Sequence, residues 1–245
     1  MSGAEALIRW NSRKYGFIGP NTFIPLLEDS ALIIPLGRWI INTAAKACNR
    51  WITSIPDFVM HINLSFVQIV KSNIIKDVLE NIERYSAANN HYVFEITETI
   101  EMDQIPAVQN VFKEFVKNEF RFAIDDFGTG YSNYGYMRDR TFDIVKVDRS
   151  FVTDIDKLKD NYLMVSFIIK MAHEMGLHVC IEGVETKEEL SCVKKLGADY
   201  IQGYYYGRPL PEQECLRYIR TFQEKAQNDR QQAAVSGETQ KEAGR

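Results

Sequence analysis

The chain has 245 residues, of which 45% are hydrophobic and 25% are charged, as is typical of a soluble globular enzyme. No apolar run approaches the roughly 18 residues that cross a bilayer, and the first residues do not resemble a secretion signal. We therefore expect a cytoplasmic protein without a membrane segment. The net charge of −4 argues against binding to DNA, which depends on basic patches that neutralise phosphates.

The cysteines and histidines narrow the chemistry further. The four cysteines are scattered without a CxxC pair, which favours reduced, buried thiols. The four histidines show no metal-ligand spacing, so a metal in this protein must be a hard cation bound by oxygen. The residues concerned are Cys48, Cys180, Cys192, Cys215, His61, His91, His173 and His178.

Short apolar segments alternate with longer amphipathic segments along the chain. The predicted strands are residues 4–8, 58–64, 92–97, 121–126, 143–148, 178–182 and 199–202. The predicted helices are residues 36–51, 74–87, 105–117, 161–175, 187–196 and 211–225. This alternation predicts an α/β fold with a parallel sheet, and its repetition predicts a TIM-like (β/α) barrel, although a closed barrel has eight strands. We expect one domain over residues 1–222 and a frayed or disordered polar tail over residues 223–245.

Each predicted strand carries, at or near its C-terminal end, a polar side chain that a buried strand does not need. In chain order these residues are Glu5, Asn63, Glu95, Asp125 with Asp126, Lys146, Glu182 and Gln202. In a (β/α) barrel the C-terminal ends of the strands meet on one face, where the active site is built. A single acidic residue after a strand is more often a helix cap or a loop residue, but the whole set is hard to explain in that way.

The chemistry of this set indicates a metal site. Carboxylate and amide oxygens suit Mg²⁺ or Mn²⁺, and so many carboxylates would repel one another unless cations neutralised them. Two divalent ions bridged by a shared Asp would do so and would form a phosphodiester-cleaving site. Lys146 follows an apolar run, where an ammonium group is costly unless it faces carboxylates, a phosphate or an attacking water.

The motifs at these positions resemble those of the EAL-domain family of cyclic di-GMP phosphodiesterases, from the first residues to about Leu216. They read EAL at 5–7, INLS at 62–65, EITE at 95–98, DDFGTGYS at 125–132, KVDR at 146–149, EGVET at 182–186 and QGY at 202–204. An isolated EAL triplet would mean little, whereas this ordered set is very specific. The resemblance implies a TIM-like barrel of the EAL type.

The resemblance also implies a role for each matching residue. It implies Glu5, Asn63, Glu95 and Asp125 as ligands of one Mg²⁺ or Mn²⁺ ion, and Asp125 with Asp126 as ligands of a second. Lys146 and Glu182 would orient and activate the attacking water, with Glu182 as the general base, and Glu98 would hold the loop after Asp126. The implied substrate contacts are Leu7, Arg9, Glu185 and Gln202.

Two further features have alternative interpretations. Asp148 lies two residues past Lys146 and so points to the same side of the strand, where it could pair with Lys146 or touch substrate. Tyr204, Tyr205 and Tyr206 could stack on guanine, although barrel packing is the favoured interpretation for most of them.

The implied reaction is the hydrolysis of cyclic di-GMP to the linear dinucleotide pGpG, which lowers cyclic di-GMP in bacterial signalling. The family forms homodimers through a surface shaped by the loop after Asp126 and the helix that follows, so we expect a homodimer here. In this loop Asn133, Tyr134 and Gly135 depart from the family pattern. A sensor or GGDEF domain upstream is a further expectation for the full-length protein.

The family places a strand with a Tyr-Gln-Pro-Ile-like sequence ahead of the EAL strand. That strand is absent from this chain, so we expect a truncated barrel that is open between the strands of Glu5 and Gln202.

Two alternatives to the phosphodiesterase stay open. One is a degenerate member that binds cyclic di-GMP without cutting it, and the other is a non-catalytic interaction scaffold. The presence of every implied metal ligand and of Glu182 favours catalysis, whereas only the missing strand favours the scaffold.

Overall fold

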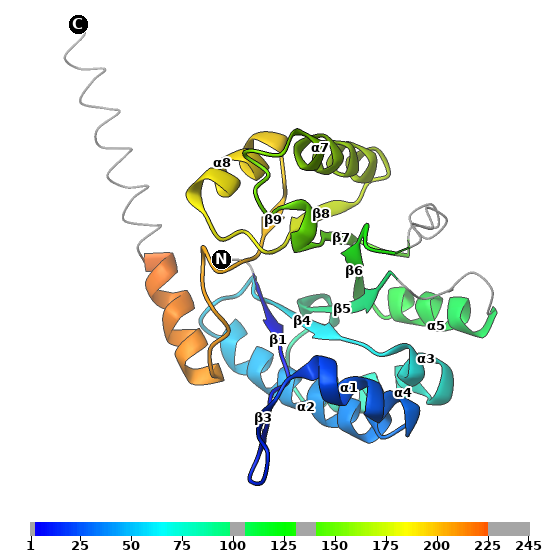
Figure 1. Cartoon of the computed structure of the whole chain (residues 1–245). Helices are drawn as coiled ribbons and strands as arrows, with labels where there is room; N and C mark the ends of the chain where they lie inside the picture. The colour runs from blue at the N-terminus through cyan, green and yellow to red at the C-terminus, as the bar shows by residue number, and fades with distance from the viewer. Residues whose placement is uncertain (1–2, 99–105, 131–140, 225–245) are drawn as a thin grey trace, which may run out of the picture. The chain divides into compact units, whose positions relative to one another are not determined.

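The computed structural model describes residues 3–98, 106–130 and 141–224, which contain a curved sheet with helices on its outer side (Figure 1). Its strands are β1 (Gly3–Ala6), β4 (Val59–Asn63), β5 (Tyr92–Thr97), β6 (Arg121–Phe127), β7 (Ile144–Val147), β8 (His178–Ile181) and β9 (Tyr200–Ile201). Their order across the sheet is β1-β4-β5-β6-β7-β8-β9, and neighbours from β4 to β9 run parallel. The seven predicted strands are therefore confirmed, and β1 and β9 are the two edges of the sheet.

The helices agree with most of the predicted ranges. They are α1 (Pro20–Asp29), α2 (Ile33–Ile52), α3 (Phe66–Lys71), α4 (Ile74–Ile82), α5 (Pro106–Lys117), α7 (Lys159–Glu174) and α8 (Lys187–Leu196), with 3₁₀ turns η1 (Asn89–His91) and η3 (Arg149–Phe151). Helices α1 and α3 were not predicted. Helix α1 contains Pro25, which reads as a helix breaker, and α3 has only six residues, too few for a helical period to stand out.

A small hairpin after β1 was also not predicted. It consists of β2 (Trp10–Ser12) and β3 (Gly16–Ile18), which pair antiparallel. The Ser12 hydroxyl accepts hydrogen bonds from the backbone N–H groups of Lys14 and Tyr15, and Gly16 takes a left-handed φ of +72°. These local contacts help to close the turn, and three-residue strands are too short to show an alternating pattern.

The outer face of the sheet is apolar and covered by helices. Helix α2 packs on β4 and α4, and its buried residues include Ile41, Ala45 and Cys48. On β5, Phe94 makes an edge-to-face contact with Phe115 of α5, with ring centroids 5.2 Å apart. Burial of the aromatic side chains, such as Phe94 and Phe115, stabilises the fold strongly, since each removes about 150–250 Å² of surface from water.

The inner face changes from apolar to charged along the strands. The layer nearer the N-terminal ends of the strands is a buried cluster of Val93, Ala123, Ile144 and Cys180. Residues two apart on a strand share a face, so the next inward positions are Glu95, Asp125, Lys146 and Glu182. The apolar layer supports a polar layer at the C-terminal ends of the strands, as the barrel prediction required.

The chain divides into two compact units, of which Ala4–Arg208 is one and Met1–Gly3 with Pro209–Arg245 the other. The first unit holds every predicted site residue. In the second, residues 212–224 are helical, in agreement with the predicted helix. The predicted tail beyond residue 224 and the loop containing Asn133, Tyr134 and Gly135 lie outside the described residues, so the domain boundary at residue 222 stays a prediction. Within the described ranges, no helix is long and apolar enough to cross a membrane.

Candidate active site

Lys146 lies at the centre of the polar layer and faces four carboxylates. Its Nζ atom is 2.8 Å from Glu95 Oε2, 2.8 Å from Glu182 Oε1, 3.0 Å from Asp125 Oδ1 and 3.8 Å from Glu5 Oε2. The side chain is only 1% exposed. Burial by itself lowers the pKa of Lys146, but the surrounding carboxylates outweigh burial and raise the pKa well above its usual value. Lys146 is therefore a permanent cation that holds side chains from four other strands together.

Asp125 and Asp126 both face the site because β6 contains one extra residue at this point. The pairing of β6 with β7 matches Ile124 to Val145 and Phe127 to Val147, so the two aspartates lie opposite Lys146 alone. Successive side chains of a regular strand point to opposite faces, and a bulge removes this restriction. Asp126 has a left-handed φ of +54°, which an Asp side chain tolerates better than most.

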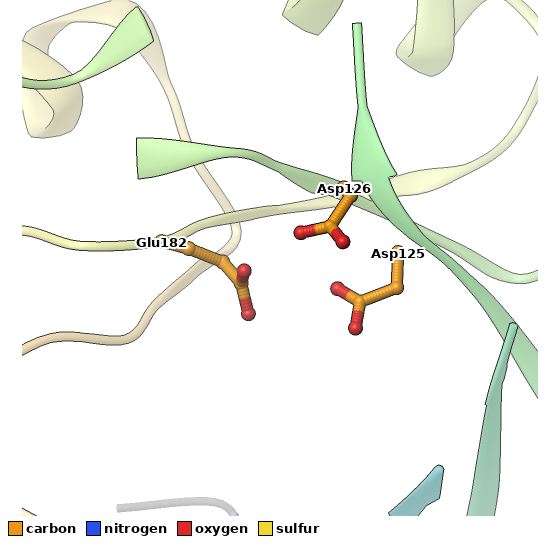
Figure 2. Close-up of side chains that lie close together, drawn as sticks. All are labelled: Asp125, Asp126 and Glu182. Carbon is orange, nitrogen blue, oxygen red and sulfur yellow. The ribbon is translucent and has the colours of Figure 1, made fainter. Parts of the chain in front are cut away.

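The carboxylates of Asp125, Asp126 and Glu182 converge on one space (Figure 2). One oxygen from each lies within 4.8 Å of the other two. Burial raises the pKa of Glu182 to about 8; Lys146 opposes this rise and the charge of Asp125 adds to it. Burial also raises the pKa of Asp126, assisted by the charges of Asp125 and Asp148. Such carboxylates would be stabilised in their ionised form by a bound cation, so these residues fit a metal site.

Glu5 and Gln202 meet across the two edges of the sheet. Gln202 Nε2 donates to Glu5 Oε2 at 2.8 Å, and Asn63 Nδ2 donates to Glu5 Oε1 at 2.6 Å. Burial alone would raise the pKa of Glu5, but Lys146 and these two hydrogen bonds hold it below its usual value. Side chains at the C-terminal ends of β1 and β9 therefore join the two edges of the sheet, and the two described strands share no backbone pairing.

Glu98 follows β5 and holds the segment after Asp126. Its Oε2 atom accepts hydrogen bonds from the backbone N–H groups of Gly128 at 2.8 Å and Gly130 at 3.3 Å. The Glu98 N–H donates to the carbonyl of Asp125 at 3.0 Å. Glu98 therefore contacts the segment on both sides of the β6 bulge, and its role in holding the two aspartates stays a prediction.

The expected substrate contacts Leu7, Arg9, Asp148 and Glu185 come after the C-terminal ends of β1, β7 and β8. Leu7 and Arg9 follow β1 and are exposed, and Arg9 Nη1 donates to the carbonyl of Ile8. Glu185 is exposed before α8. Asp148 Oδ1 accepts from the Ser150 N–H at 2.9 Å and so begins η3. Within the described residues Asp148 is not among the ion-pair partners of Lys146, so the pairing alternative was wrong; the strand ends at Val147, and Asp148 turns to cap the next element.

The favoured interpretation of the tyrosines was also wrong for two of them. Tyr204 is 47% exposed and Tyr205 is 41% exposed, which excludes burial in the barrel. The Arg208 guanidinium lies 4.3 Å from the centroid of the Tyr204 ring. These residues come after the short strand β9 has ended.

His61 was not predicted as a site residue, yet it contacts the centre from the neighbouring strand β4. His61 Nδ1 lies 2.7 Å from Glu95 Oε1. Burial raises the pKa of Glu95, and Lys146 and the hydrogen bond from His61 oppose this rise. The signal was present in the sequence, because His61 is two residues before Asn63 and must share its face of the strand.

Comparison with known proteins identifies the family. A profile of the EAL domain matches residues 1–209. MucR of Pseudomonas aeruginosa, a bifunctional diguanylate cyclase/cyclic di-GMP phosphodiesterase, is 31% identical over 220 residues, which cover 89% of this chain and 32% of MucR. The cyclic di-GMP phosphodiesterase PdeL of Escherichia coli is 32% identical over 214 residues, which cover 86% of this chain and 59% of PdeL.

The fold comparison agrees with the sequence comparison. The solved structure of the MucR phosphodiesterase in complex with c-di-GMP superposes with a TM-score of 0.82 at 30% identity, covering 88% of this chain and 87% of that one. This match confirms the predicted TIM-like (β/α) fold. The chain spans about a third of the length of the first curated relatives that it matches. With a profile match over most of its length, the chain belongs to the EAL domain family.

Proposed function

We propose that this chain is a metal-dependent phosphodiesterase that hydrolyses cyclic di-GMP to pGpG. The observation that carries the proposal is the buried centre in which Lys146 faces carboxylates from four other strands. Relatives that match most of the chain are named cyclic di-GMP phosphodiesterases, and a solved relative holds c-di-GMP.

The charge of the site supports two divalent cations. Five carboxylates lie around one ammonium group, which leaves four negative charges when all are ionised. The carboxylates are Glu5, Glu95, Asp125, Asp126 and Glu182. Two divalent cations would balance this charge, and a dianionic substrate would not enter the site without them. Bound Mg²⁺ or Mn²⁺ supplies a polarised phosphoryl oxygen and a more acidic water.

Each residue of the centre has a proposed part in this reaction. Glu5, Asn63, Glu95 and Asp125 hold one ion, and Asp125 with Asp126 holds the other. Glu182 accepts a proton from the attacking water, and Lys146 orients that water through its contact with Glu182. The water oxygen bonds to phosphorus as the bond from phosphorus to the 3′ oxygen breaks, and the released 3′ oxygen takes up a proton from solvent. The phosphate stays on the 5′ end of pGpG, and Glu182 later returns its proton to solvent.

The surrounding residues would position this chemistry. Glu98 holds the segment after Asp126, and Gln202 orients Glu5 through the hydrogen bond that joins them. Leu7, Arg9, Asp148 and Glu185 are proposed substrate contacts. A metal-binding role for Glu182 is also supported, since its carboxylate oxygen converges with those of Asp125 and Asp126.

A combined hydrolysis and binding experiment tests the proposal. Purified protein should convert cyclic di-GMP to pGpG with Mg²⁺ or Mn²⁺ and lose this activity after exhaustive chelation. Ca²⁺ should inhibit, because its longer and looser coordination positions water poorly. Binding of cyclic di-GMP without turnover would establish the alternative of a non-catalytic receptor. Neither binding nor turnover would favour the interaction scaffold.

Several expectations about the full-length protein stay predictions. They are the homodimer, the cytoplasmic location, the choice between Mg²⁺ and Mn²⁺, and a sensor or GGDEF domain upstream. The last is supported by MucR, a bifunctional relative of which this chain covers 32%.

A further inference from the structure

We infer that His61 is a positioning residue that fixes the Glu95 carboxylate for metal binding; this rests on the proposed function. His61 lies on β4 and Glu95 on the neighbouring parallel strand β5, where the register pairs His61 with Val93 and Asn63 with Glu95. His61 is therefore offset by two residues from Glu95 and reaches it from the apolar side of the site. Its Nδ1 atom is 2.7 Å from Glu95 Oε1.

The contact is shielded from solvent. The Glu95 side chain is fully buried and that of His61 is 20% exposed. A hydrogen bond to a buried carboxylate is stronger than the same bond in water, and its loss leaves an acceptor without a partner. When Glu95 is ionised, the form that binds a metal ion, its carboxylate only accepts hydrogen bonds, so His61 then donates from Nδ1.

Together, His61 and Lys146 fix the orientation of Glu95. Lys146 Nζ contacts Oε2 at 2.8 Å, while His61 Nδ1 contacts Oε1. With one donor on each oxygen, the carboxylate cannot rotate, and its remaining lone pairs point in a set direction. A Glu side chain without such partners would lose rotamer entropy when it binds a cation. Glu95 is already held by His61 and Lys146, so it avoids this loss.

The other histidines do not share this arrangement. His91 Nδ1 lies 2.7 Å from the carbonyl oxygen of Phe58, at the opposite end of the strands. His173 and His178 both approach Asp199, which has no assigned part in the site. All four histidines lie in described parts of the chain, so His61 is the one in contact with a proposed metal ligand. His91 supplies a matched control, with a hydrogen bond of equal length and a similar degree of burial.

The test compares His61→Leu with His61→Asn and His61→Gln. Leu removes the donor. Asn places an amide N–H close to the position of Nδ1, whereas the longer Gln places it elsewhere. The first readout is Mn²⁺ binding to chelated protein by titration calorimetry, which does not require turnover. His61→Leu should weaken Mn²⁺ binding by roughly ten- to hundredfold, as loss of a residue that orients a ligand does elsewhere. His61→Asn should restore most of this affinity and His61→Gln should not.

The second readout separates kcat from KM. His61→Leu should lower kcat for cyclic di-GMP at saturating Mn²⁺ with little change in KM, since His61 supports a metal ligand and lies below the substrate face. His91→Leu should leave Mn²⁺ affinity within about twofold of wild type. If His61→Leu fails to fold, the comparison of His61→Asn with His61→Gln still decides the question.

The outcomes distinguish this inference from the proposed function. Wild-type Mn²⁺ affinity in His61→Leu, or equal affinities in the Asn and Gln variants, would overturn the positioning role. A wild-type protein that binds Mn²⁺ but does not hydrolyse cyclic di-GMP would refute the phosphodiesterase and leave the calorimetric comparison intact. A wild-type protein that binds no Mn²⁺ would refute both.

Discussion

Glu98 accepts the backbone N–H of Gly128 at 2.8 Å, which ties the end of β5 to the segment that follows the two aspartates of β6. This half-buried contact lies next to the bulge that interrupts the pairing of β6 with β7. The segment after Asp126 is therefore held by a residue that directly follows another strand, β5.

Glu98→Ala should lower kcat/KM for cyclic di-GMP by about tenfold or more, because the backbone N–H groups of half-buried Gly128 and exposed Gly130 lose the acceptor that holds the segment after Asp126. Glu98→Gln should recover part of the activity, since its amide oxygen still accepts. Steady-state kinetics at saturating Mg²⁺ provides the measurement. Glu80→Ala, which removes only an exposed partner of Lys76, serves as the control. Activity of Glu98→Ala within twofold of wild type would contradict the assigned role.

Lys146→Met should strongly destabilise the metal-free protein. Removing one member of a buried ion pair costs about 3–5 kcal/mol, and here four carboxylates lose a shared cation. Urea unfolding at neutral pH in the presence of chelator would measure the change. Lys157→Met removes an exposed contact with Asp154 and should leave the free energy of unfolding nearly unchanged. An equal effect of the two substitutions would show that the central ammonium does not stabilise the fold.

The metal-free protein should become less stable relative to Glu182→Gln as pH rises. The pKa of Glu182 is raised from 4.5 to about 8 by burial, so the folded state holds this proton more tightly than the unfolded state. The stabilising contribution is fully present below pH 4.5 and is lost as pH rises to about 8. Glutamine mimics the protonated acid at every pH. The difference in Tm between Glu182→Gln and wild type should therefore grow from pH 5 to pH 8, and a constant difference would argue against the raised pKa.

Gly183→Ala should impair both stability and catalysis, because it crowds the residue next to Glu182. Gly183 has a left-handed φ of +73°, and an added Cβ would lie 2.3 Å from the Cβ of Arg149. Gly176 has a similar φ of +78° with open space around it. Gly176→Ala should thus cost only the roughly 1–2 kcal/mol of the left-handed conformation. Thermal unfolding and kcat for the two variants would separate backbone strain from crowding, and equal effects would show that crowding at Arg149 is unimportant.

Much of the fold could be predicted from local patterns. The seven strands were found because short Val-, Ile- and Phe-rich runs alternate with helical periods, and their parallel order follows from the crossover helices. The β2–β3 hairpin and α3 could not be predicted, since elements of three to six residues are too short to show a period. Helix α1 was not predicted either, and it carries Pro25 in its interior, where proline usually disfavours a helix.

The sequence by itself determined which polar residues reach the C-terminal face, because strand ends and the alternation of side chains are local properties. Only the tertiary structure decided their partners. Glu5 and Gln202 are 197 residues apart and meet because the sheet curves. The bulge that turns both Asp125 and Asp126 inward depends on the register of β6 against β7, and the contact of His61 with Glu95 depends on the register of β4 against β5. These contacts depend on distances of a few ångströms between strands, which a periodic pattern within one strand does not encode.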